Sequence, residues 1–211
     1  MRNVRILAAL VFGLAPVVLS GQFFDPVLSL HLGAGYSVLA TSEYDDYEEV
    51  SDTFRFTGDA DLLYVLGSGN GDVSVAAGGS YRYASPYEGL TMNVFGATGA
   101  MLINVSETFT QQVQFTVGNA SLRSTIENEA SPETGSGLYT ELKIHLYAPI
   151  FPITDLGSTG TVFLAPGFWT NAGVMLGGLL DPPDDTATVT PLTDTLTTVS
   201  VGLGLSFVLV E

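Results

Sequence analysis

The stretch 27–38 reads VLSLHLGAGYSV, and its residues alternate between two kinds. Apolar side chains stand at every second position from Leu28 to Val38, and mostly small or polar ones stand between them. This period of two indicates a β-strand with one apolar face. The run covers about 12 residues, whereas strands of globular proteins average about 5–6 and strands that cross a membrane need about 9–11. The length therefore favours a membrane barrel.

The same alternation recurs along the rest of the chain, between segments with the composition of turns. Two stretches are less regular: 90–103 is apolar on both faces, and 161–178 contains Pro166, which cannot donate to a strand ladder. We count both, because the spacing of the turns requires them. The predicted strands are 27–38, 53–66, 72–84, 90–103, 108–118, 138–148, 161–178 and 196–210.

The connections between these strands alternate in length. Short ones are predicted at 67–71, 85–89 and 104–107, with a somewhat longer turn that contains two prolines at 149–159. Long polar or acidic loops are predicted at 43–52, 119–137 and 179–195. Outer-membrane barrels have an even number of strands, short turns at one end and longer loops at the other. We therefore predict an all-β fold over residues 21–211: one eight-stranded antiparallel up-and-down transmembrane β-barrel with its long loops outside.

The composition excludes several other classes of protein. The chain has 211 residues, of which only 13% are charged, against about 25% in an average soluble domain. Its 24 glycines argue against a helical bundle. The absence of cysteine excludes disulfides, thiol catalysis and thiolate metal sites. A net charge of −16 excludes nucleic acid as a partner, because that requires a basic surface.

Residues 1–20 have the pattern of a secretory signal peptide. Arg2 and Arg5 precede an apolar run, and Val18 and Ser20 are small enough for the cleavage site before residue 21. The run is interrupted by glycine and proline and is shorter than the roughly 20 residues of a membrane-spanning helix. We expect residues 1–20 to be removed, which leaves four basic side chains against 22 acidic ones.

The pattern of strands resembles the small eight-stranded outer-membrane barrels, the group of the OmpA transmembrane domain, OmpX and OmpW. The resemblance covers residues 22–211 and rests on alternation, not on a motif. It implies a place in the bacterial outer membrane, contact with its lipid, assembly by the barrel-insertion machinery, and a structural role or an interaction with an extracellular partner. Those chains usually end in an aromatic residue, whereas this one ends in Val210-Glu211. Two aromatic girdles are expected, an outer one at Phe54, Phe56, Tyr81 and Tyr83 and an inner one at Tyr64, Phe109 and Phe207.

Charged residues on the predicted inner face form the candidate site. An eight-stranded barrel is just wide enough for its own side chains, and buried charges must be paired. Without the histidines the set holds three positive and three negative charges, so we predict an ion-pair network that fills the lumen. The alternative is a narrow channel for small or hydrophobic solutes. The residues are Arg55, Asp59, Asp61, Arg82, Glu141, Lys143 and His145, with His31 lower in the barrel.

The sequence predicts no catalytic residues and no cofactor. Some barrels that resemble this one modify lipid A with a serine, a histidine and an acidic residue, the serine standing two positions after the histidine. The two imidazoles here are His31 and His145, and position 147 is tyrosine. Because His145 falls on the predicted inner face, we interpret it as a hydrogen-bonded interior histidine.

Acidic side chains in the first long loop could attract a cation, because oxygen-rich loops bind Ca²⁺. The spacing does not match an EF-hand, so a solvated acidic surface is the better interpretation and the metal stays undecided. A secreted soluble β-sandwich is the remaining alternative, but it leaves strands of 11–15 residues with unbroken apolar faces unexplained. The loop residues are Glu43, Asp45, Asp46, Glu48, Glu49 and Asp52.

Overall fold

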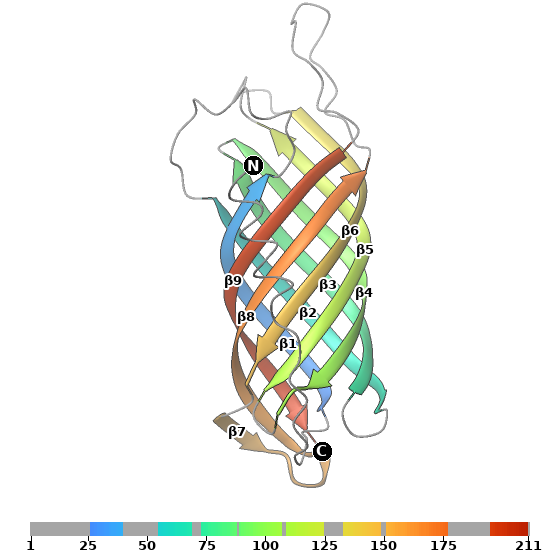
Figure 1. Cartoon of the computed structure of the whole chain (residues 1–211), viewed down its shortest axis with the longest axis vertical. Coiled ribbons are helices and arrows are strands. Elements are labelled where there is room, and N and C mark those ends of the chain that lie inside the picture. Colours follow the sequence, from blue (N-terminus) through green and yellow to red (C-terminus); the bar gives the residue numbers. More distant parts are fainter. Residues whose placement is uncertain are drawn as a thin grey trace, which may run out of the picture.

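Eight long antiparallel strands close into a barrel in the structure, a computed structural model (Figure 1). Each pairs with its neighbours along the chain, and pairing of the first with the last completes the ring. The structure describes residues 26–39, 55–68, 73–87, 89–106, 109–124, 133–148, 151–176 and 195–210. The strands of the wall are β1 (Pro26–Leu39), β2 (Phe56–Ser68), β3 (Val73–Tyr87), β4 (Leu90–Asn104), β5 (Thr110–Ser124), β6 (Glu133–Tyr147), β8 (Thr161–Leu176) and β9 (Thr195–Val210).

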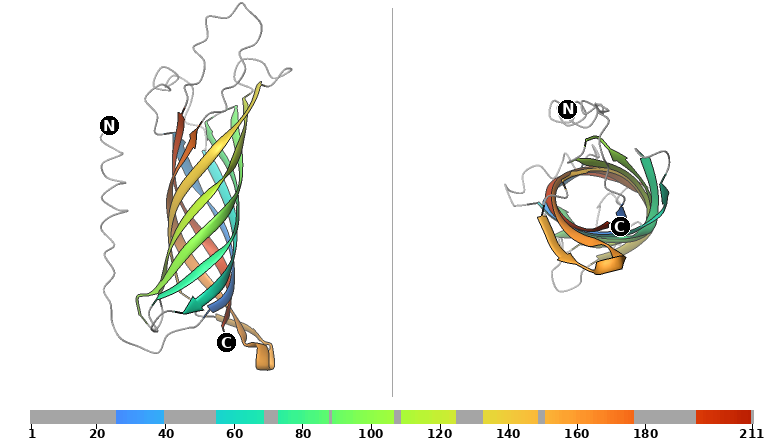
Figure 2. Two further views of the ribbon diagram at one scale, coloured as in Figure 1. Left: turned by 90° about the vertical axis from the view of Figure 1, so that its right-hand side faces the viewer. Right: turned by 90° about the horizontal axis from the view of Figure 1, so that it is seen from below.

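The predicted fold class is confirmed: the wall is an all-antiparallel, eight-stranded, up-and-down barrel. Figure 2 shows the tilt of the strands in the side view and the round outline of the barrel from below. Six of the eight strands are longer than the sequence indicated, most of all β5 and β6 with 15 residues each, whereas β2 and β8 are not. No helix among the described residues is long and apolar enough to span a bilayer.

The prediction of a long loop at 119–137 is wrong, because most of these residues belong to strands. β5 continues to Ser124 and β6 begins at Glu133, with pairs such as Ser121↔Ser136 between them. Apart from Ala120 and Leu122, these residues are polar or glycine, so they lack the long apolar alternation that marked most of the other strands. Backbone groups nevertheless pair wherever two strands lie side by side. In the same way β3 extends through Tyr87, so the predicted loop 85–89 contracts to a turn with Gly89 at φ 74°.

The predicted turn 149–159 is also wrong, because it contains a ninth strand. β7 (Phe151–Asp155) pairs with the first residues of β8, and a short 3-10 helix, η2 (Gly157–Thr159), connects the two. β8 extends beyond the end of β6, so it has β6 as its neighbour from Gly167 onward and β7 before that point. This hairpin lies outside the ring of eight.

Pro166 lies where β8 changes from one neighbour to the other. Its carbonyl accepts a hydrogen bond from the Ala148 N–H, which immediately follows β6. In an antiparallel strand the N–H and C=O of one residue point toward the same neighbour. The Pro166 nitrogen therefore faces Ala148 as well, one residue beyond the end of β6, so the missing donor lies where the pairing of β8 with β6 stops.

The two faces of the wall differ as the alternation predicted. Outward side chains form an exposed apolar belt, with Leu203 71% exposed and Phe95 65% exposed. The described girdle residues lie on this face, and Tyr81 and Phe95 stack with ring centroids 4.7 Å apart. Phe54 lies outside the described residues. An exposed apolar belt of this kind is suited to lipid.

Two apolar clusters lie inside the barrel. The upper cluster lies toward the end at which β4 begins, and the lower cluster lies toward the end at which β4 terminates. They explain why the stretch 90–103 is apolar on both faces: Leu90, Met92 and Val94 point into the upper cluster, and Ala100 and Leu102 into the lower one. The upper cluster contains Ala84, Leu90, Met92, Val94, Ala120, Leu122, Tyr139, Met175 and Leu196. The lower cluster contains Leu63, Ala76, Ala100, Leu102, Tyr147, Ala165 and Val208.

Candidate functional site

A layer of buried charged and polar side chains lies inside the barrel between the two apolar clusters. We call it the middle layer. It draws residues from six strands, and each of its ionisable side chains is at most 6% exposed. Its members are His31 (β1), Asp59 and Asp61 (β2), Arg82 (β3), Gln112 and Gln114 (β5), Glu141, Lys143 and His145 (β6), and Trp169 and Asn171 (β8).

Lys143 binds two carboxylates at once. Its Nζ forms ion pairs with Asp59 and, at 2.6 Å, with Asp61. Gln114 Nε2 donates to the other Asp61 oxygen at 3.0 Å, and Gln112 Nε2 donates to Gln114 Oε1 at 2.7 Å. All of these side chains are buried, so the charges of Lys143, Asp59 and Asp61 face one another and not water.

Arg82 and Glu141 form the second ion pair of the middle layer. The guanidinium binds the carboxylate through both terminal nitrogens, and the Nη2–Oε1 distance is 3.0 Å. Tyr139 donates to Glu141 Oε2 at 2.9 Å, and Asn171 Nδ2 donates to the same oxygen at 3.1 Å. Two-pronged arginine–carboxylate pairs are strong and fix the geometry of both side chains.

Trp169 lies against both cations. Lys143 Nζ is 5.1 Å from the centroid of its ring, and Arg82 Cζ is 5.6 Å from it. The indole is fully buried, and cations at this distance from an aromatic face are attracted to its electrons. Trp169 therefore connects the Lys143 and Arg82 ion pairs into one unit.

The two histidines lie together in the middle layer. His31 Nε2 is 3.4 Å from Asp59 Oδ2, and His31 Nδ1 is hydrogen-bonded to the Ser206 hydroxyl at 3.2 Å. Its ring centroid is 4.1 Å from that of His145. The prediction that His31 lies lower in the barrel is therefore wrong, because the register pairs it with Asp61.

His145 is interior, as its position on the inner face predicted, but it is not the hydrogen-bonded histidine that we expected. Neither of its ring nitrogens has a hydrogen-bond partner among the described residues. Its contacts are ring contacts, with His31 and with Tyr147 at a centroid distance of 4.9 Å. The imidazole is packed as an aromatic ring between the charged side chains and the lower apolar cluster.

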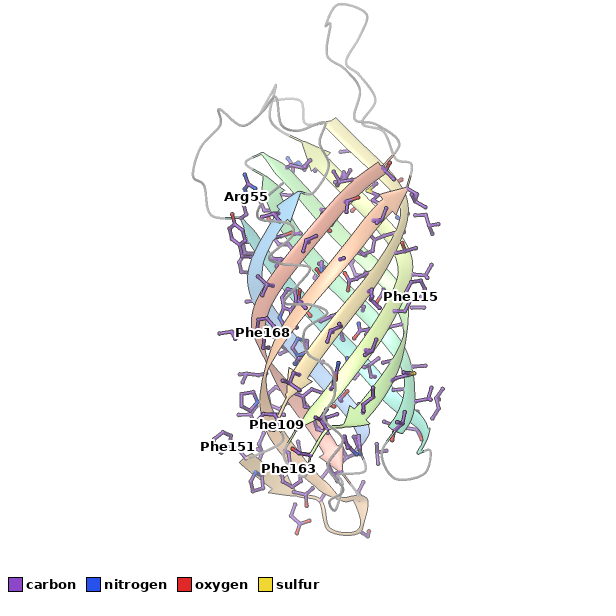
Figure 3. All side chains as sticks on the ribbon, in the orientation of Figure 1. Arg55, Phe109, Phe115, Phe151, Phe163 and Phe168 are labelled. Carbon is purple, nitrogen blue, oxygen red and sulfur yellow. The ribbon has the colours of Figure 1, made fainter. Side chains whose placement is uncertain are left out.

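Arg55 lies outside the middle layer. It precedes β2 by one residue, is half-buried, and lies toward the upper end of the barrel (Figure 3). The predicted balance of three cations and three anions does not describe the middle layer, where Arg82 and Lys143 face the carboxylates of Asp59, Asp61 and Glu141.

Several members of the middle layer were not recognised from the sequence as part of the candidate site. Gln112 and Gln114 fell on the predicted inner face, so their alternation could have identified them. Trp169 and Asn171 stand in a stretch without clear alternation, so no feature of the neighbouring sequence indicated that their side chains point into the barrel. Their roles depend on which side chains reach them from β3 and β6.

The middle layer also contains the one group of described residues with the geometry of a metal site. His31, Asp59 and Asp61 offer ligand atoms within 4.8 Å of one another. The Lys143 ammonium bonds to both of these carboxylates and so takes the position of a cation. The predicted acidic loop with Glu43 and its neighbours lies outside the described residues, as do residues 1–20.

Close packing around His31 depends on a glycine of β9. A Cβ at Gly204 would lie 2.9 Å from His31 Nε2 and 2.9 Å from the Leu32 carbonyl oxygen. We expect Gly204→Ala to lower the free energy of unfolding by about 1–3 kcal/mol, because overfilled interiors are strained. Urea unfolding in detergent measures this. Gly99→Ala is the matched control: no atom lies within 4 Å of its Cβ position, so a comparable loss there would contradict the packing argument.

The comparisons with known proteins identify the fold. A scan against protein-family models finds no match, and no curated protein sequence matches the chain. Among solved structures, the Neisserial surface protein A has a similar fold, with a TM-score of 0.53 over 85% of this chain and 96% of that one. The fold is that of a small outer-membrane β-barrel. The two sequences are 10% identical, so the similarity concerns the fold alone.

Two further solved barrels match at lower scores. Ail, the attachment invasion locus protein of Yersinia pestis, is 12% identical with a TM-score of 0.46, over 87% of this chain and 99% of that one. The N-terminal β-barrel domain of OprF from Pseudomonas aeruginosa is 11% identical with a TM-score of 0.40, over 86% and 98%.

Proposed function

We propose that this barrel resides in the bacterial outer membrane as a structural or surface-interaction protein, and that its lumen is closed by the middle layer. Residues 1–20 would direct export and be removed, the apolar belt would contact lipid, and the barrel-insertion machinery would assemble the chain. The acidic loops would face the outside. The observation that carries the closed lumen is the pair of buried ion-pair centres at Lys143 and Arg82.

The arrangement along the barrel axis supports closure at three levels. In the middle layer, buried side chains from six strands meet inside the barrel, and its carboxylates are bound by Lys143 and Arg82. The upper and lower apolar clusters lie on either side of it. Apolar constrictions obstruct ions because water leaves them readily. An ion would therefore have to cross two apolar clusters and break at least one buried ion pair.

The geometry does not favour catalysis in the lumen. A general base must lie within reach of a nucleophile and of a substrate. Glu141 is engaged by Arg82, Tyr139 and Asn171, and the His145 ring is packed against two aromatic neighbours. We assign these residues to packing and charge pairing.

Conductance in planar bilayers tests the closed lumen. We expect the refolded mature chain to give no steady current, because ions cannot pass a filled lumen of eight strands. A wide trimeric porin added to the same bilayer is the control for insertion. The paired variant Arg82→Ala/Glu141→Ala removes one ion pair without changing net charge, and it should produce brief current steps. A steady current from the unmodified chain would favour the narrow channel instead.

A further inference from the structure

A short two-stranded ribbon projects beyond the lower end of the barrel, the end at which β4 terminates, which we call the turn end. The ribbon has no part in the closure of the lumen that we propose. It consists of β7, η2 and the first residues of β8, which together span 151–164. Figure 2 shows it standing out from the wall at the end where β9 terminates. β8 pairs with one edge of β7, and no described strand pairs with the other.

The ribbon exposes apolar side chains and carries little charge. All five residues of β7 are exposed, including Phe151 at 54% and Ile153 at 52%, and Leu156 follows at 47%. Asp155 is the one charged residue between positions 151 and 165. A contiguous exposed apolar surface marks a site of interaction.

The register connects this surface to the outer wall of the barrel. Phe151 pairs with Leu164, Leu164 with Phe207, and Phe207 with Leu30. Directly paired residues of antiparallel strands project on the same face of a sheet. Leu30 and Phe207 belong to the exposed apolar belt. One apolar row therefore runs without a break from the belt onto the ribbon.

We propose that the ribbon 151–164 is a lipid-binding element, and that its outer face lies in the headgroup region of the membrane leaflet at the turn end. This inference rests on the proposed membrane location. Continuity with the belt selects lipid as the occupant. Phe151 lies near the same end of the barrel as the exposed Phe109 (Figure 3), and aromatic rings occupy that depth in barrels.

The chemistry of the contact is apolar. The ribbon has no lysine or arginine, so it gains nothing from anionic headgroups, and binding scales with the apolar area that it buries. The ribbon enlarges the lipid contact of the barrel beside β8. Neutral phosphatidylcholine is therefore the appropriate probe.

Site-specific fluorescence tests the inference, because the chain has no cysteine to compete for a label. Two matched variants sample the two faces. Thr154→Cys lies on the outer face, opposite Val162, and Thr161→Cys lies on the other face, opposite Asp155. Each labelled protein is placed in phosphatidylcholine vesicles with nitroxide on the acyl chains, or with iodide in the water. We expect nitroxide quenching at position 154 to exceed that at 161 by about threefold or more, with the reverse order for iodide.

A third label at Leu203→Cys, on the wall in β9, reports whether the barrel itself is in the bilayer. If nitroxide quenches at 203 while position 154 responds to iodide alone, the lipid assignment of the ribbon is overturned and the proposed membrane location stands. If 203 also fails to respond to nitroxide, the proposed location is overturned as well. Protection of 154 from both quenchers would mean that protein and not lipid covers the outer face of the ribbon, and would overturn the lipid assignment.

Discussion

Lys143→Met should lower the free energy of unfolding by about 3–5 kcal/mol, because breaking a buried ion pair leaves uncompensated charge. Lys143 is the shared cation of Asp59 and Asp61, and all three side chains are at most 1% exposed. Without the ammonium, two neighbouring carboxylates remain inside the barrel with no cation between them. Urea unfolding of the barrel in detergent, followed by gel mobility before and after boiling, measures the loss.

Two control variants separate charge pairing from general damage. Adding Asp59→Asn and Asp61→Asn to Lys143→Met removes the uncompensated charges, so most of the lost stability should return. Arg123→Met removes a cation from an exposed position of β5, and a surface change of this kind should stay within about 0.5 kcal/mol. If Lys143→Met leaves stability unchanged, the closed-lumen proposal is wrong.

Trp169→Ala is expected to have the second large effect, a loss of about 3–5 kcal/mol, which is the usual cost of deleting a buried aromatic side chain. Trp169 is fully buried and lies against the Lys143 and Arg82 cations. Its removal would leave a cavity in the middle layer and separate the two ion-pair centres. Thermal and urea unfolding in detergent measure the change.

Phe168→Ala is the matched control, because Phe168 is adjacent in sequence on the opposite face of β8 (Figure 3). Outside the lumen, lipid or detergent fills the space that the ring leaves, so the cavity part of the cost is absent. We expect the Phe168 variant to lose roughly half as much stability as the Trp169 variant or less. Equal losses would mean that Trp169 does not connect the two ion pairs.

The middle layer combines electrostatic pairing with a nearly dry setting. Ion pairs gain most where neighbouring apolar groups keep water away, but their burial costs most there too. The apolar clusters on either side make the Lys143 and Arg82 centres depend on their own partners. In the closed lumen that we propose, the same separation from water would obstruct ions.

The sequence by itself determined the fold class and the inner face. Alternation is a local property: the parity of Asp59, Asp61, Glu141 and Lys143 within their strands places each side chain inside the barrel, whatever the other strands do. Six long alternating runs, together with two less regular stretches that the spacing of the turns required, then predicted the eight strands of the wall. Their ends were predicted less well, because residues 119–124 and 133–137 hold only Ala120 and Leu122 as apolar side chains, too few to indicate a strand, although they pair along their whole length.

Only the tertiary structure decided which charges meet. Arg82 and Glu141 are 59 positions apart, and Lys143 and Asp59 are 84 apart, so their heights are set by the register of several strands and by closure of the ring. Closure also brought His31 to the level of Asp59, left Arg55 outside the middle layer and placed Trp169 between the cations. The ribbon 151–164 arose for the same reason: β8 extends beyond the end of β6, and β7 pairs with the edge that β8 would otherwise expose. Local patterns fix the face on which a side chain lies, and register between distant strands fixes its neighbours.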